Sequence, residues 1–255
     1  MIPKTIFQSH RSKELPSNVL SKVENMRYKL NPEYKYKLFD DDEMDAYVND
    51  NFSDSIRNAY NNLNIPAAKC DFWRYLIICK EGGIYLDVDA ENHCSLDKVF
   101  TPSDSAVVSG GFQHNKQYSQ WALAFEAGHG ILENVIDMVV ENIETKRYPK
   151  SVLKTTGPIV YTEAIQKIHQ RNFVKQIPWD RIDKNTNWEF LAGPHGDSFR
   201  ILGKEWNGKQ KECMRIFEHK FSGWRTLYED EESRRGEGSS NHWRWMEKNT
   251  PLFKK

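Results

Sequence analysis

The chain has 255 residues, of which 38% are hydrophobic and 28% are charged, so its composition is that of a globular protein and excludes an intrinsically disordered one. Thirty-six basic residues balance thirty-six acidic ones, which disfavours nucleic acid as a partner. No apolar run has the length of a signal peptide or a transmembrane helix, and the four cysteines form neither a CxxC pair nor a dense disulfide framework. We therefore expect a cytoplasmic protein with reduced thiols.

Hydrophobic periodicity and capping signals predict strands that alternate with helices. In chain order we expect a strand at 4–8, a helix at 16–30, a strand at 34–39, a helix capped by residues 40–42, helices at 53–63 and 66–81, strands at 84–89 and 106–110, and helices at 131–145 and 158–170. Short strands and loops should follow in 173–221. This order predicts the α/β class, with a mainly parallel sheet flanked by helices.

The domain organisation follows from the same pattern. Residues 1–229 should form a single catalytic domain, whereas 230–255 should form a mobile charged loop and an aromatic C-terminal tail that contains Trp243 and Trp245. Amphipathic aromatic residues and the terminal lysines would suit a peripheral contact with a membrane. Packing of the tail on the domain, or closure over a bound ligand, is the simpler hypothesis.

The helix at 66–81 carries the first part of a candidate site. Pro66 suits its first turn and Gly82-Gly83 should end it. An amphipathic spacing predicts one core face, made by Phe72, Tyr75, Leu76 and Cys79. Asp71 and Arg74 are three residues apart and so share a neighbouring face.

Asp87 and Asp89 form the second part. If both lie on the strand at 84–89, their side chains point the same way, while Val88 faces the core. Two carboxylates directed at one point repel each other unless a cation lies between them, and oxygen ligands suit Mn²⁺ or Mg²⁺ bound to phosphate. A solvated acidic turn is the alternative for an isolated Asp-x-Asp. The nearby Gly-Gly turn, Asp71 and Arg74 favour the metal site.

These residues carry a family resemblance. The block A-x-x-x-D-x-x-R at 67–74, followed by G-G-x-Y-x-D-x-D at 82–89, resembles glycosyltransferase family 32 and, more distantly, the large clostridial glucosylating toxins. Residues 2–8 resemble the first strand of the family, Thr156-Gly157-Pro158 resembles its T-G-P, and residues 219–224 resemble its late segment. The match thus spans about residues 2–224. The Thr-Gly-Pro taken alone is no more than a helix entry with Pro in its first turn.

The resemblance implies a GT-A fold and a role for each matching residue. Asp89 would bind the metal and Asp87 would contact the ribose and the metal shell. Asp71 and Arg74 would hold the hydroxyls of the donor sugar and the diphosphate. Gln8 and His10 would also contact the donor, and His10 occupies the place of an early family Trp that stacks on the base, where the alignment has no gap.

The late segment completes the implied site. The toxins have E-x-x-S-x-W there, with a metal contact, a hydroxyl near the phosphate and an indole N–H on the bridging oxygen. The same spacing in this sequence gives His219, Ser222 and Trp224. Imidazole can replace the carboxylate as a ligand of Mn²⁺. The implied metal set is therefore Asp87, Asp89 and His219, and the implied catalytic set is Asp87, Asp89, Arg74 and Trp224.

The acidic motif and the resemblance together predict a Mn²⁺- or Mg²⁺-dependent glycosyltransferase, and the resemblance implies that it retains the configuration at the anomeric carbon. Its partners would be a nucleotide-sugar donor, a UDP-sugar in preference to GDP-mannose, and a glycan, a glycolipid or another hydroxyl acceptor. A metal-dependent phosphohydrolase is the main alternative, because dehalogenase-type phosphatases also carry a strand-end Asp-x-Asp. Those enzymes usually have Thr or Val where this chain has Glu91. An inactive sugar-nucleotide-binding module is the second alternative.

Overall fold

The computed structural model of the chain describes residues 1–90, 95–98, 100, 102, 104–109, 118–171, 190–192, 198–202 and 243–254. The elements in chain order are β1 (Thr5–Ser9), α1 (Ser17–Glu24), the π-helical η1 (Asn25–Leu30), β2 (Lys35–Phe39), α2 (Asp41–Asn51), α3 (Asp54–Asn62), α4 (Pro66–Glu81), β3 (Gly83–Leu86), the 3-10 turn η2 (Leu96–Lys98), β4 (Ala106–Ser109), β5 (Ser119–Phe125), α5 (Gly130–Glu144), α6 (Val152–Thr155), α7 (Pro158–Arg171), β6 (Phe190–Ala192), β7 (Ser198–Leu202) and α11 (Trp243–Asn249).

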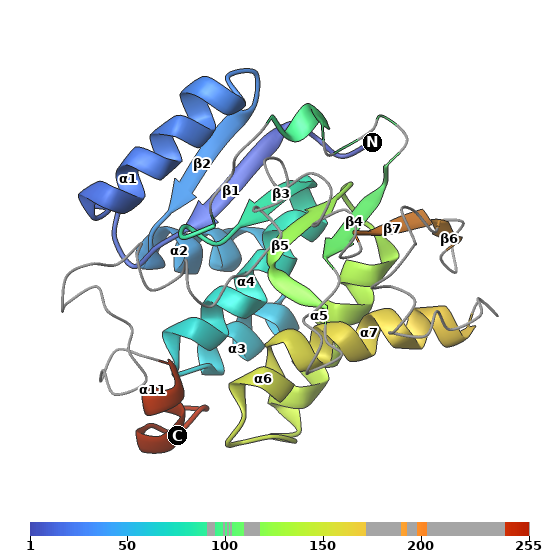
Figure 1. Ribbon diagram of the computed structural model, residues 1–255. Coiled ribbons are helices and arrows are strands. Elements are labelled where there is room, and N and C mark those ends of the chain that lie inside the picture. The colour runs from blue at the N-terminus through green and yellow to red at the C-terminus, as the bar shows by residue number, and fades with distance from the viewer. Residues whose placement is uncertain are drawn as a thin grey trace.

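A seven-stranded sheet in the order β2-β1-β3-β5-β4-β7-β6 forms the centre of the molecule (Figure 1). The pairs β1–β2, β1–β3 and β4–β7 are parallel, whereas β5 runs antiparallel to β3 and β4, and β6 runs antiparallel to β7. Five strands therefore run in one direction, with β5 and β6 reversed. The predicted α/β class with a mainly parallel sheet is confirmed.

Alternating residues of the strands divide the core into two parts, because successive side chains of a strand point to opposite faces. Ile6, Ile84 and Val107 pack with α1 on one face of the sheet. Phe7 and Tyr85 pack on the other face, against the larger group of helices α2 to α7. The layers are visible in Figure 1, where α1 lies on the opposite side of the sheet from α3 and α4.

Helix α4 is the central helix of the larger layer. Its predicted bounds are confirmed, since Pro66 occupies the first turn and Gly82, with φ of 64°, ends the helix. The expected amphipathic pattern is wrong: all eight residues from 71 to 78 are buried. The physical reason is its position, because β3 and β5 cover one side while α2, α5 and α6 cover the others.

Several other boundaries differ from the predictions. The helix expected at 16–30 is α-helical only to Glu24, since the N–H of Asn31 binds the carbonyl of Met26, five residues earlier, and the last turn widens. Strand β5 and the short helix α6 were not predicted. In 173–221 the structure describes β6 and β7, which agree with the expected short strands, and the remaining residues of that segment lie outside the described ranges.

The aromatic tail packs on the domain and contains the helix α11, which the sequence pattern did not predict (Figure 1). Phe253 forms a bridge with Leu63, and the N–H of Asn64 donates to the carbonyl of Leu252 at 2.8 Å. Leu252 and Phe253 are buried. In the part of the chain that the structure describes, no helix has both the length and the apolar character needed to cross a bilayer.

Candidate functional site

The candidate site lies where the strand order reverses. The chain passes from β1 outward to β2 and then returns to β3 on the other side of β1, so the carboxyl ends of β1 and β3 form a switch point. Open α/β sheets bind ligands at such a point. Ser9 ends β1 and Asp87 directly follows β3, so the topology alone brings the predicted acidic motif to this edge.

Asp87 and Asp89 lie in a turn beyond the strand. The expectation that both belong to an extended strand is wrong, because β3 ends at Leu86 and the N–H of Ala90 donates to the carbonyl of Asp87 at 2.8 Å. The N–H of Asp87 still pairs with the carbonyl of Trp121 on β5. Val88 is buried, as predicted, and Asp89 is half-buried.

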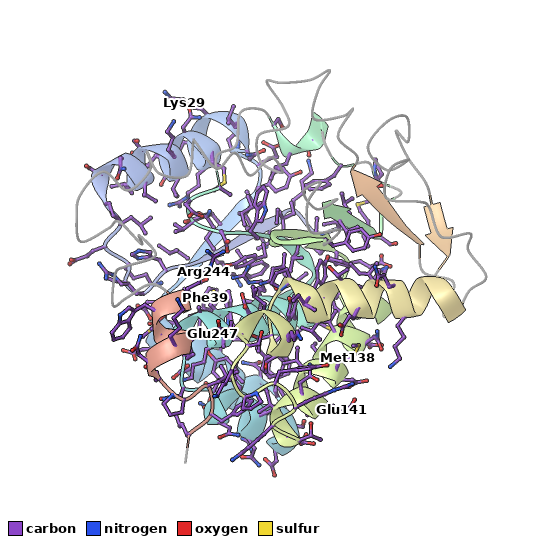
Figure 2. The ribbon with its side chains drawn as sticks, turned by 60° about the horizontal axis from the view of Figure 1, so that its bottom comes forward. Lys29, Phe39, Met138, Glu141, Arg244 and Glu247 are labelled. Carbon is purple, nitrogen blue, oxygen red and sulfur yellow. The ribbon has the colours of Figure 1, made fainter. Side chains whose placement is uncertain are left out.

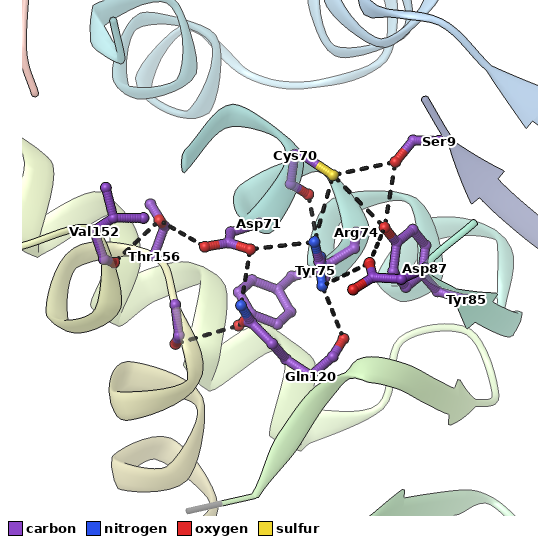
Figure 3. Close-up of polar contacts among 11 residues, drawn as sticks. Ser9, Cys70, Asp71, Arg74, Tyr75, Tyr85, Asp87, Gln120, Val152 and Thr156 are labelled. Carbon is purple, nitrogen blue, oxygen red and sulfur yellow. Dashed lines mark hydrogen bonds and ion pairs between the residues drawn. The ribbon is translucent and has the colours of Figure 1, made fainter. Parts of the chain in front are cut away.

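Arg74 connects the two halves of the motif (Figure 3). Its guanidinium lies 3.2 Å from the carboxylate of Asp71 and 3.2 Å from that of Asp87. It also donates to the carbonyl of Gln120 at 3.1 Å and approaches Sγ of Cys70 at 3.4 Å. Burial opposes the charge of Arg74, but Asp87 and its other neighbours raise its pKa above the ordinary value, so the guanidinium stays protonated. Asp71 and Arg74 thus lie on one face of α4, as predicted, and the structure adds an ion pair between them.

Asp71 is held by donors from three elements. Gln120 of β5 donates to Oδ1 at 2.8 Å, Thr156 donates to Oδ2 at 3.3 Å, and Arg74 of α4 completes the set. Burial is the largest influence on the pKa of Asp71, and the neighbouring charge of Asp87 acts in the same direction. Arg74 and the two hydrogen bonds oppose them, and the resulting pKa is about 6. This carboxyl group therefore changes its charge near neutral pH.

A second group of side chains surrounds Asp87 from the β1 side. The hydroxyl of Tyr85 donates to Oδ1 of Asp87 at 2.8 Å, and the ring of Tyr85 lies beneath the guanidinium of Arg74. Ser9 contacts both the hydroxyl of Tyr85, at 3.2 Å, and Sγ of Cys70, at 3.1 Å. Cys70 and Cys79 are free thiols, as expected.

Sequence reasoning did not assign Ser9, Cys70, Tyr85 or Gln120 to the site. A signal existed for Tyr85, which lies in the G-G-x-Y-x-D-x-D block two residues before Asp87 and so faces the same side. No signal existed for Gln120, because it lies on a strand that the sequence pattern did not predict.

Two further residues that were predicted to contact the donor, Gln8 of β1 and His10 just after it, lie at the same edge. Nε2 of Gln8 donates to the carbonyl of Asp87 at 3.2 Å, and Tyr36 donates to Oε1 of Gln8 at 2.9 Å. His10 is buried, and its Nδ1 is 2.8 Å from the carbonyl oxygen of Ser12. The structure thus brings Gln8 to the acidic turn, whereas the contacts of both residues with a donor stay predictions.

The predicted late residues His219, Ser222 and Trp224 lie outside the described residues, and their roles stay predictions. Among the residues that are described, no three His, Cys, Asp or Glu side chains form a metal-binding group. The acidic turn contributes two carboxylates, those of Asp87, whose side chain is 33% exposed, and of the half-buried Asp89.

Part of the chain matches a known protein family. Residues 16–106 match the family described as "Glycosyltransferase sugar-binding region containing DXD motif", a range that contains α4, β3 and the acidic turn. The chain is similar to initiation-specific alpha-1,6-mannosyltransferases of Schizosaccharomyces pombe, 28% identical over 64% of this chain, and Candida albicans, 25% identical over 75%. It spans 48% and 60% of the lengths of these two relatives.

A solved structure supports the fold. The PaToxG glycosyltransferase has a TM-score of 0.56 to this chain, with 19% sequence identity, and the likeness covers 67% of this chain and 70% of that one. At this identity the likeness concerns the fold alone. The predicted GT-A type of fold is confirmed.

Proposed function

We propose that the chain transfers a sugar from a nucleotide-diphosphate donor to a hydroxyl group of an acceptor, because residues 16–106 match the family described as a glycosyltransferase sugar-binding region containing a DXD motif. One observation carries the proposal: the carboxylate of Asp87, bound to Arg74 and Tyr85, lies at the switch point between β1 and β3. This is the edge of an α/β sheet where a nucleotide would be expected.

The described residues fit a divalent cation that is shared with a diphosphate. Mg²⁺ and Mn²⁺ are commonly held by one or two protein carboxylates together with phosphate oxygens, which is what Asp87 and Asp89 can offer. His219 would add a third ligand, as the family resemblance implies. When bound, such an ion would neutralise the charge that develops on the departing diphosphate.

The buried half of the site suits the sugar. Asp71 presents a carboxylate whose orientation is fixed by three donors, and a carboxylate is a strong acceptor for the hydroxyl groups of a sugar. Arg74 places a permanent positive charge between Asp71 and Asp87, where it would counter the negative charge of the leaving group. As the family resemblance implies, the hydroxyl of Ser222 would lie near the phosphate and the indole N–H of Trp224 would donate to the bridging oxygen, with retention at the anomeric carbon.

The identity of the donor is open between two nucleotides. The resemblance of the late segment to the toxins favoured a UDP-sugar, whereas the relatives named above are mannosyltransferases, so GDP-mannose is at least as well supported. The acceptor stays a prediction: a glycan, a glycolipid or another compound with a hydroxyl group.

A combined binding and turnover experiment tests the proposal. The wild-type chain would be melted with UDP-sugars and with GDP-mannose, in Mn²⁺, in Mg²⁺ and in excess EDTA, and donor hydrolysis or transfer would be measured alongside. We expect one donor to raise the melting temperature only with the metal present. Asp89→Asn is the matched control and should keep its fold and lose the response.

Each alternative function gives a different pattern in the same experiment. Release of phosphate from phosphomonoesters without a response to any nucleotide sugar would establish a phosphohydrolase. Metal-dependent binding of the donor without turnover would establish an inactive binding module. Full turnover in excess EDTA would overturn the metal site.

A further inference from the structure

The Thr156-Gly157-Pro158 segment is more than an entry to helix α7. Thr156 is fully buried, and its hydroxyl lies 3.3 Å from Oδ2 of Asp71, a residue 85 positions earlier in the chain. The same hydroxyl lies 3.4 Å from the carbonyl of Val152 (Figure 3). It has one proton to donate, and an ionised carboxylate is a better acceptor than a peptide carbonyl. We therefore assign the donation to Asp71 when that group is charged.

The backbone around Thr156 is closely held. The carbonyl of Val152 accepts from the N–H of Thr156 at 3.0 Å and from the N–H of Gly157 at 2.9 Å. A Cβ on Gly157 would lie 2.7 Å from Cα of Leu153, so only glycine allows this close turn. Pro158 then begins α7 directly. The short segment thus leaves the hydroxyl of Thr156 little freedom to move.

The first residue of α6 is anchored from the tail. The N–H of Val152 donates to the carboxylate of Glu247 on α11 at 2.6 Å. Figure 2 labels Glu247 on this helix at the side of the domain. A continuous set of hydrogen bonds therefore runs from α11 through Val152 to Thr156 and on to Asp71.

The other oxygen of Asp71 is fixed independently. Nε2 of Gln120 donates to Oδ1, and the orientation of this amide is set by the hydroxyl of Tyr75, which donates to Oε1 of Gln120. With Oδ1 held by Gln120 and Arg74, the rotation of the carboxylate about its last torsion depends on what binds Oδ2. Thr156 is the group that does so.

We propose that Thr156 is a positioning residue of the sugar-binding site, which acts by fixing the carboxylate plane of Asp71 and, through it, the guanidinium of Arg74. The inference rests on the proposed function, since it takes Asp71 as a group that contacts the donor. It assigns a function to the Thr-Gly-Pro motif, which is the weakest of the motifs in the sequence. It also makes Thr155, its immediate neighbour, a matched control.

Thr155 is equally buried, and its hydroxyl donates to the carbonyl of Tyr148 at 3.1 Å, away from Asp71. Thr155→Val and Thr156→Val each remove one buried hydroxyl of the same size from the same stretch of chain. Both should lower the melting temperature by similar amounts. Only the loss of the hydroxyl at Thr156 should weaken the binding of the donor.

The test measures the dissociation constant of the nucleotide sugar that the wild-type chain binds, with Mn²⁺ present. We expect Thr156→Val to weaken donor binding about 10-fold, the size of one charge-assisted hydrogen bond. Thr155→Val should bind as the wild type does, and Thr156→Ser, which restores the hydroxyl, should recover most of the affinity. If Thr156→Val does not fold, Thr156→Ala removes the same hydroxyl with less bulk.

Two results would overturn the inference alone: normal donor binding by Thr156→Val, or equal weakening by Thr155→Val. A double-mutant cycle adds a further check, because Thr156→Val should have no additional effect on donor binding in an Asp71→Asn background. If the effects of the two substitutions on donor binding were additive, Thr156 would act independently of Asp71. A wild-type chain that binds no nucleotide sugar would overturn the proposed function itself, and the inference with it.

Discussion

Asp71 and Asp87 share one guanidinium but stand in different surroundings. The side chain of Asp71 is 11% exposed and receives donors from α4, from β5 and from the end of α6. The side chain of Asp87 is 33% exposed, follows a strand in a turn, and is held by Arg74 and Tyr85. One side of the site is thus organised before any ligand arrives, while the other keeps carboxylate surface open to one.

This difference shows that the single cation of Arg74 serves two purposes. Toward Asp71 the guanidinium of Arg74 compensates a buried charge, which is a requirement of the fold. On the other side, the same guanidinium lies next to the partly exposed carboxylate of Asp87, where a diphosphate would bind. Variants on the buried side should therefore change stability as well as donor binding, whereas variants on the open side should change activity with little effect on stability.

The largest effect is expected for Arg74→Met, which acts on both sides at once. It leaves Asp71 and Asp87 without their shared cation, so the free energy of unfolding should fall by about 3 kcal/mol or more. Turnover should fall about 10³-fold in the fraction that folds. Urea unfolding and donor hydrolysis measure the two quantities.

Arg57→Met is the matched control for that experiment. Arg57 forms its ion pair with Asp54 on the surface of α3, where the side chain of Arg57 is 40% exposed and that of Asp54 is 81% exposed. The same loss of a guanidinium should there cost about 0.5 kcal/mol or less and leave turnover unchanged. Similar costs at the two positions would contradict the distinction between a buried and a surface pair.

Asp87→Asn should separate activity from stability. The open carboxylate contributes little to the fold, so the free energy of unfolding should change by about 1 kcal/mol or less, whereas turnover should fall about 10²-fold. Asp45→Asn provides the comparison, because Asp45 likewise accepts from a tyrosine hydroxyl, that of Tyr60, and from a cation, Lys69. Loss of activity in both variants, or in neither, would remove Asp87 from the site.

The buried side has a pH signature. Because the pKa of Asp71 is raised from 3.8 to about 6 in the folded state, the protonated form is favoured by folding, and its contribution to stability is lost as the pH rises from about 4 through 6. Arg74, Asp87, Gln120 and Thr156 face this carboxyl group and are unchanged in an Asp71→Asn variant. Relative to the wild type, that variant should gain about 2 to 3 kcal/mol between pH 4 and pH 7.

Urea unfolding of both chains at several pH values measures this difference, and the other titrating groups cancel because the two chains share them. A difference that stays constant with pH would mean that the carboxyl group of Asp71 has an ordinary pKa. The arrangement around Asp71 would then differ from the one described.

The smallest effect is expected for Tyr85→Phe. The change removes the hydroxyl that donates to Asp87 but keeps the ring under Arg74, so stability should fall by about 1 kcal/mol and turnover about fivefold. Tyr34→Phe removes an equivalent bond, from a hydroxyl to Asp97 at 2.7 Å, and should leave turnover unchanged. An unchanged turnover in Tyr85→Phe would show that Arg74 alone orients Asp87.

The part of the site that the sequence could predict is local. The bounds of α4, the approach of Asp71 to Arg74 and the position of Asp87 after β3 all depend on residues within one helix, one turn and one strand. Pro66 and Gly82 mark the helix by properties of their own backbones. These features could therefore be inferred from spacing and from the family resemblance.

The part that could not be predicted is non-local. Gln120 reaches Asp71 across 49 positions because β5 inserts antiparallel between β3 and β4, against the order of the chain. Thr156 reaches it across 85 positions. The end of β3 at Leu86 depends on a turn that closes at Ala90, and no periodicity marks that turn. The periodicity of the sequence does not specify the register in which distant segments pair.

The bridge between Leu63 and Phe253 has a consequence for the order in which the chain folds. At about 5–20 residues per second, roughly 10 to 40 s pass on the ribosome between the synthesis of these two residues. During that interval the apolar surface that Leu252 and Phe253 later bury stays uncovered, and a contact of such sequence separation forms slowly. The nascent domain therefore exposes this apolar surface to solvent until the tail docks.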